Sequence, residues 1–179
     1  TFTLIIFPFL GQDAFQKSTL ISGLTTRIVS SGLNIEFGEM LLPAIIALSA
    51  LFFYAFMTKT GEVYQYWMFA FLLIFSTIHF HIQWLLWVAP LLVILFIEKP
   101  QFVKPMLILI PLIFSIPLLY QDLYMTVGLF NAISPLFSSL PTPFTFLQRV
   151  YDPYTSSSIL HSMLLGGSLI FGWRLLNSK

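Results

Sequence analysis

Long apolar runs separated by polar segments dominate the pattern along this chain. Ten mostly apolar residues (1–10) precede a polar segment at 11–39, and an apolar run follows at 40–57. Residues 64–97 contain no charged side chain, and two further apolar runs lie at 103–120 and about 157–176. Because a helix needs about 20 apolar residues to cross a bilayer, this pattern predicts membrane-spanning helices.

The uncharged stretch at 64–97 is too long for one span. A single helix there would measure about 51 Å at 1.5 Å per residue, whereas the hydrocarbon core is about 30 Å thick. Two short helices that meet near His79–Gln83 fit better. The sequence therefore predicts an all-α, polytopic transmembrane helix bundle with about five full spans. Pro43 falls in a first helical turn, where proline is tolerated, while Pro111 and Pro117 should kink their helix.

The remaining segments are predicted not to span. Residues 1–10 resemble the end of a helix that starts outside this chain, so we expect a C-terminal part of a larger protein. Residues 11–39 place Phe15, Leu20, Leu24 and Ile28 at near-helical spacing, which suits an interfacial amphipathic helix. Residues 121–155 alternate apolar pieces with Pro, Ser and Asn. We interpret 1–179 as one transmembrane domain with 11–39 and 121–155 on its outer face.

Composition agrees with a membrane location. The chain is 58% hydrophobic and only 8% charged, whereas soluble domains carry about 25% charged residues. So few charged side chains cannot cover a water-exposed surface, so we expect lipid to cover much of it. The lipid bilayer is therefore the first expected partner. A net charge of +1 gives no support for binding nucleic acid. The chain has no cysteine, which excludes thiolate chemistry and disulfides within it.

The positive charges suggest an orientation. With two helices in 64–97, five basic residues fall on one side and three on the other, and the richer side is predicted to be cytoplasmic. The five are Lys59, Lys99, Lys104, Arg174 and Lys179; the three are Lys17, Arg27 and Arg149. One long helix would instead give six to two, so charge alone slightly prefers that alternative. The length argument favours two helices, which gathers 11–39, the histidine junction and 121–155 outside.

The junction carries the most distinctive polar residues. If it is helical, His79, Gln83 and Trp87 share one face at i, i+4 and i+8, whereas His81 and Trp84 belong to another stripe. His79 and His81 would then lie about 200° apart at about 100° per residue, too far for one metal ion without an extended turn. Two interpretations stay open: binding of a phosphate or sugar hydroxyl, or interfacial side chains satisfied by water and backbone.

No cofactor is predicted, and the spacing gives no support for a divalent metal. Zinc sites need three or four ligands, and neither an HExxH motif nor a carboxylate lies near the histidines. Glu36, Glu39 and Asp122 have the chemistry of bases or ligands, but their spacing singles none of them out. His161 begins the last span, and the glycine doublet at 166–167 suggests close helix contact.

Two arginines are candidate phosphate ligands. Arg27 and Arg149 both fall on the predicted outer face, where an arginine can bind a phosphate through two hydrogen bonds. For Arg149 the structural alternative is a local ion pair with Asp152, three residues further on.

The stretch STIHFHIQWLLWVAPLLVIL resembles the late-helix motif of integral-membrane GT-C glycosyltransferases, especially prokaryotic polytopic mannosyltransferase-like proteins. The matching residues are Gln83, Trp84, Trp87 and Pro90, with His79 and His81 ahead of them. The resemblance covers about 20 residues.

The resemblance implies a polyprenyl-phosphate-linked sugar donor and hexosyl transfer, mannose included, at the outer face of a prokaryotic plasma membrane. It also implies a catalytic carboxylate in an early outer loop, which this chain does not contain. His79, His81, Gln83, Trp84 and Trp87 would line the substrate site, and Arg27 or Arg149 would hold the donor phosphate. The alternatives are a transporter or flippase segment, with a helix broken at Pro111 and Pro117, and a non-catalytic scaffold subunit.

Overall fold

The described part of the chain is almost entirely helical. The computed structural model describes residues 32–35, 39–58, 60–123 and 126–178. Its helices are α4 (Pro43–Thr58), α5 (Val63–Thr77), α6 (Leu85–Glu98), α7 (Val103–Leu118), α8 (Pro143–Leu147) and α9 (Pro153–Leu176). A short antiparallel pair of strands, β1 (Leu33–Asn34) and β2 (Met40–Leu41), precedes α4. The first predicted span therefore starts later than expected, with Pro43 as its first helical residue.

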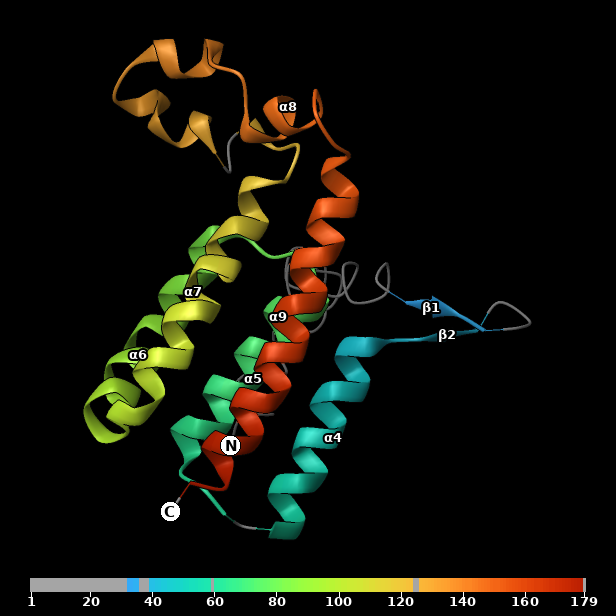
Figure 1. Ribbon diagram of the computed structural model, residues 1–179, viewed down its shortest axis with the longest axis vertical. Coiled ribbons are helices and arrows are strands. Elements are labelled where there is room, and N and C mark those ends of the chain that lie inside the picture. Colours follow the sequence, from blue (N-terminus) through green and yellow to red (C-terminus); the bar gives the residue numbers. More distant parts are fainter. Residues whose placement is uncertain (1–31, 36–38, 59, 124–125, 179) are drawn as a thin grey trace, which may run out of the picture.

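Five of these helices form a bundle around α5 and α9. α5 packs against α4, α6 and α9, and α9 also packs against α7. Figure 1 shows α4, α5, α6, α7 and α9 side by side, with the segment between α7 and α9 gathered at one end. Large side chains fill the centre, among them Met68, Leu72, Phe75, Met106 and Leu164, all with no exposed surface.

The two ends of the bundle differ in charge and size. The described parts of the short connections 58–63 and 99–102, with the end of α9, form one end, which is called the basic end here after Lys99, Lys104 and Arg174; Glu62 and Glu98 lie there as well. The α5–α6 junction at 78–84 and the segment 119–152 form the other, called the junction end (Figure 1). The histidine junction and the described part of 121–155 lie at the same end of the bundle, and that this end is the outer face stays a prediction; most of 11–39 lies outside the described residues.

The break predicted within 64–97 is confirmed. α5 ends at Thr77, Ile78 takes an extended conformation, and a 3-10 turn at Ile82–Trp84 leads into α6. Pro111 and Pro117 do not interrupt α7, whereas the transporter alternative expected a helix broken at these prolines. α7 continues through Pro111 and ends one residue after Pro117.

Among the described residues, two helices are long and apolar enough to cross a membrane. Pro100–Leu118, which is α7 with its preceding 3-10 turn, has a mean hydropathy of 1.8, and α9 has 1.4. The apolar helices Pro43–Thr58, Val63–Thr77 and Ile82–Glu98 are shorter, so five spans of full length are not established. Before the start of α9, the described part of 121–155 contains only α8 and short 3-10 helices, Val127–Ala132 and Pro135–Ser139 among them. The prediction that this segment does not span agrees with this.

The outward faces of the bundle are strongly apolar. Phe56 on α4, Leu86 and Ile97 on α6 and Ile108 on α7 expose 73%, 73%, 75% and 69% of their surface. Soluble proteins rarely expose contiguous apolar patches of more than a few hundred Å². Apolar side chains therefore fill the core and also cover the outside, as expected where lipid rather than water is the solvent.

α9 begins at a well-formed cap. Asp152 accepts hydrogen bonds from the backbone N–H groups of Tyr154 and Thr155, at 3.4 and 2.8 Å, and from the Thr155 hydroxyl at 2.6 Å. The bonds from Thr155, the hydroxyl first, hold the pKa of Asp152 below its usual 3.8. Pro153 occupies the first helical position, where its missing N–H costs nothing. The local sequence thus fixes where the last long helix starts.

Candidate functional site

The junction end brings together most of the predicted site residues. Residues 78–81 connect α5 to the 3-10 turn without helical structure, and both Ile78 and His81 have extended backbone. Ile78 and Phe80 are buried with 2% and 0% exposure, whereas His79 is exposed and His81 half-buried. This alternation follows from the two-residue period of extended backbone. Both histidines therefore point away from the core.

This geometry corrects the predicted helical face. His79 precedes the helical turn, so His79, Gln83 and Trp87 do not share one face of a helix. The hydroxyls of Ser76 and Thr77 bond to the carbonyls of Leu72 and Leu73 at 2.5 and 2.7 Å at the end of α5. Such bonds offer the backbone an alternative to continuing the helix. The separation of about 200° between the two histidines was conditional on a helical junction, and this condition is not met.

Tyr120, at the end of α7, holds the extended segment in place. Its ring stacks on His79 with centroids 3.5 Å apart and an interplanar angle of 27°, and it meets Phe80 edge-on. The backbone N–H of Phe80 donates to the Tyr120 hydroxyl at 3.4 Å. Sequence reasoning missed this residue because 40 positions separate it from Phe80. Only its place at the end of an apolar run hinted at a role.

An aromatic surface continues from the histidines. His81 lies beside Trp84, with ring centroids 6.3 Å apart. Trp84 and Trp87 stack almost parallel, with centroids 5.8 Å apart and planes 4° from each other. Trp87 exposes 60% of its surface, and Gln83 is also exposed. Exposed aromatic faces beside an amide suit a ligand with one apolar and one polar side.

Arg149 lies at the same end of the bundle, in the segment between α8 and α9. Its guanidinium lies 5.8 Å from the centre of the Phe146 ring. In the described part of the chain it makes no ion pair with Asp152, whose carboxylate instead caps α9. The local ion pair offered as an alternative is therefore wrong. Arg27 and Glu36 lie outside the described residues.

The carboxylates and the remaining histidine do not complete a metal site. Within the described ranges, no three His, Cys, Asp or Glu side chains gather closely enough to hold a metal ion. Asp122 belongs to the junction end, and Glu39 adjoins β2. His161 lies on α9, and its Nδ1 pairs with the Ser76 carbonyl at 3.1 Å. Because helix ends leave carbonyls unpaired, His161 serves to close the end of α5.

The glycines of α9 contribute differently from the prediction. A methyl group on Gly167 would meet Leu109 of α7 at 2.8 Å, but one on Gly166 would meet nothing within 4 Å. The tightest contact belongs to Gly172, which packs against the ring of Phe69 on α5. The prediction of close helix contact at 166–167 therefore holds for Gly167, but it did not include Gly172, where the helices are closest.

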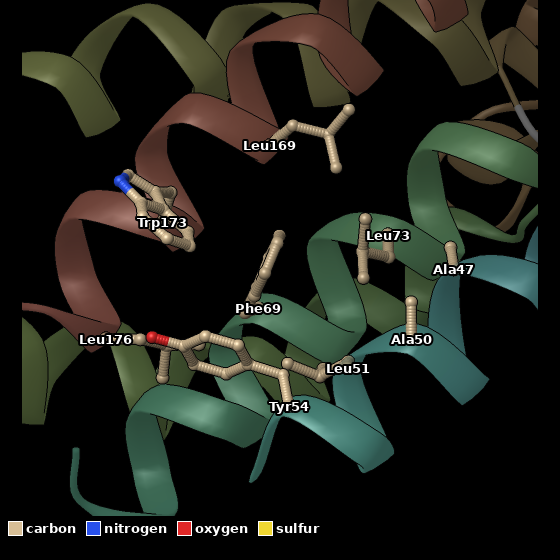
Figure 2. A pocket seen from close by; sticks show the side chains of 9 residues that line it. All are labelled: Ala47, Ala50, Leu51, Tyr54, Phe69, Leu73, Leu169, Trp173 and Leu176. Carbon is tan, nitrogen blue, oxygen red and sulfur yellow. The ribbon is translucent and has the colours of Figure 1, made fainter. Parts of the chain in front are cut away.

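A large apolar groove lies on another part of the bundle. It has a volume of about 360 Å³ between α4, α5 and α9. Figure 2 shows Phe69 in the middle, with Tyr54 and Trp173 toward one end. The Tyr54 hydroxyl donates to Asn177 at 3.1 Å. Among the described residues, none of the predicted site residues lines this groove, so its size alone does not connect it with their chemistry.

Comparison with protein families, curated proteins and solved structures gives no match to this chain. The resemblance to GT-C enzymes therefore rests on the sequence alone: on Gln83, Trp84, Trp87 and Pro90, with His79 and His81 ahead of them, and on the alternation of apolar runs with long polar segments.

Proposed function

We propose that this chain is part of a polytopic membrane glycosyltransferase of the GT-C type. In this proposal α4, α5, α6, α7 and α9 all cross the bilayer, the shorter ones where the membrane is locally thinned. The junction end faces the outside of a prokaryotic plasma membrane. It binds a polyprenyl-phosphate-linked sugar, with mannose the first candidate, and the catalytic carboxylate comes from a part of the protein outside this chain.

The observation that carries the proposal is the grouping at the junction end. The rings of His79 and His81 lie near the exposed amide of Gln83 in the sequence, and His81 lies beside the stacked Trp84 and Trp87. A sugar ring presents hydroxyls at its rim and C–H groups on its faces, so it matches an amide next to an exposed indole.

Arg149 supplies the charge that the donor requires. An arginine binds phosphate oxygens through charge-assisted hydrogen bonds, and in transfer from a polyprenyl phosphate the leaving group is the phosphate. Stabilising the charge that develops there lowers the barrier. Arg27 has the same chemistry. The apolar outer faces of the bundle give the polyprenyl chain a place in the lipid beside the site.

Gln83→Ala and Arg149→Ala are both expected to slow transfer in the full-length protein without loss of folding. A hydrogen bond to a charged group contributes about 1.5–3 kcal/mol and a neutral one about 0.5–1.5 kcal/mol. Arg149→Ala should therefore cost roughly tenfold to hundredfold, and Gln83→Ala up to about tenfold. The measurement is transfer of radiolabelled sugar from a polyprenyl-phosphate donor in membranes.

Gln148→Ala is the matched control, since Gln148 is an exposed amide at the same end of the bundle with no role in the proposed site. It should retain wild-type turnover. Wild-type turnover in both Gln83→Ala and Arg149→Ala would refute the assignment of the site.

A further inference from the structure

A second groove lies between α7 and α9, toward the basic end. It has a volume of about 380 Å³ and reaches from Gln101 and Arg174 to Ile108, Leu109 and Gly167. Gly167 and Arg174 are seven residues apart on α9, so the groove extends roughly 10 Å along the helix at 1.5 Å per residue. Its polar side chains are Gln101 and Arg174, while the portion toward the bundle centre is apolar.

The charge at the mouth of this groove is positive. Arg174 is exposed in the last turn of α9, and no acidic side chain is among the described residues that line the groove. In the described part of the chain Arg174 makes neither a hydrogen bond nor an ion pair, whereas the neighbouring Lys99 donates to the Ser178 carbonyl at 3.1 Å. The guanidinium is therefore available to a ligand.

We propose that this groove binds an anionic phospholipid. The lipid phosphate lies against Arg174 and Gln101, and one acyl chain follows Ile108, Leu109 and Gly167 toward the middle of the bundle. By the positive-inside rule the basic end faces the cytoplasm, where the leaflet is rich in anionic lipid and basic pockets between spanning helices bind such headgroups. The proposal requires membrane insertion but not glycosyl transfer.

The groove of Figure 2 provides an internal comparison. It lies on another face of α9, lined by Leu169, Trp173 and Leu176, and it is similar in size. No charged side chain is among the described residues that line it. It can hold an acyl chain but offers nothing that distinguishes one headgroup from another. Selectivity for anionic lipid should therefore depend on Arg174.

The test is native mass spectrometry of the detergent-purified protein titrated with dioleoyl phosphatidylglycerol or dioleoyl phosphatidylcholine. The wild type should retain one phosphatidylglycerol at concentrations where it retains no phosphatidylcholine. Arg174→Gln should weaken this retention about tenfold, as expected for one charge-assisted hydrogen bond. Ile108→Trp, which fills the apolar part and leaves the charge, should weaken it as well.

Lys104→Gln is the matched control, because Lys104 is an exposed cation at the same end that does not line the groove. It should bind phosphatidylglycerol like the wild type. Equal retention of both lipids by the wild type, unchanged retention in Arg174→Gln, or an equal loss in Lys104→Gln would overturn the proposal. So would unchanged retention in Ile108→Trp, or displacement of the lipid by inorganic phosphate. None of these readouts depends on transferase activity, so this proposal and the proposed function fail separately.

Discussion

Gly172→Ala is expected to destabilise the bundle, whereas Gly166→Ala is expected to stabilise it slightly. Both glycines lie within α9, where alanine is favoured over glycine by roughly 1 kcal/mol. At Gly166 nothing lies within 4 Å of an added methyl group, so this gain remains. At Gly172 the methyl group would overlap the Phe69 ring, which is itself 9% exposed. Overpacking of this kind costs about 1–3 kcal/mol.

The measurement is the thermal unfolding midpoint of the two variants in the same detergent. Gly172→Ala should unfold below the wild type and Gly166→Ala at or above it. A double variant, Gly172→Ala with Phe69→Leu, should recover part of the loss, because the smaller side chain makes room for the methyl group. Equal midpoints for the two single variants would contradict the close packing of α5 on α9.

Tyr120→Ala is expected to unfold the junction end and to cost about 3–5 kcal/mol, as for other large buried aromatic side chains. Tyr120 is 6% exposed and carries both the stack with His79 and the hydrogen bond from Phe80. Its loss should therefore release the extended segment that places both histidines.

Tyr120→Phe separates the two contributions. It keeps the stacking ring and removes the hydroxyl, so its cost should be only about 0.5–1.5 kcal/mol. Thermal unfolding measures the cost, and protection of the Phe80 amide from hydrogen exchange reports on the segment itself. Tyr120→Ala should lose this protection and Tyr120→Phe should keep part of it. Similar behaviour of the two variants would show that the ring does not hold the junction.

The length of the apolar runs predicted the fold better than it predicted the site. Residues 64–97 are too long for one span, and the two helices α5 and α6 are found there. The face shared by His79, Gln83 and Trp87 was wrong because it assumed helical backbone through the junction. Side-chain hydroxyls at Ser76 and Thr77 compete there for backbone carbonyls, and helical periodicity does not register that competition.

Contacts between distant segments account for what the sequence did not predict. The pairing of His161 with the Ser76 carbonyl joins residues 85 positions apart, and the stack of His79 on Tyr120 is of the same kind. The sequence analysis predicted close helix contact at the glycine doublet 166–167, yet the closest approach of a helix to a glycine of α9 is at the single Gly172. Such contacts depend on how helices pack, which local patterns do not specify.

The most direct test of the central claim is the accessibility of single cysteines in intact cells. The chain has no cysteine of its own, so each variant introduces one reactive thiol into it. Gln83→Cys and Ser139→Cys lie at the junction end, and Thr60→Cys lies at the basic end. A membrane-impermeant maleimide should label the first two from outside and Thr60→Cys only after permeabilisation. Labelling of Thr60→Cys from outside, or opposite behaviour of Gln83→Cys and Ser139→Cys, would contradict an outer-face site on a membrane-spanning bundle.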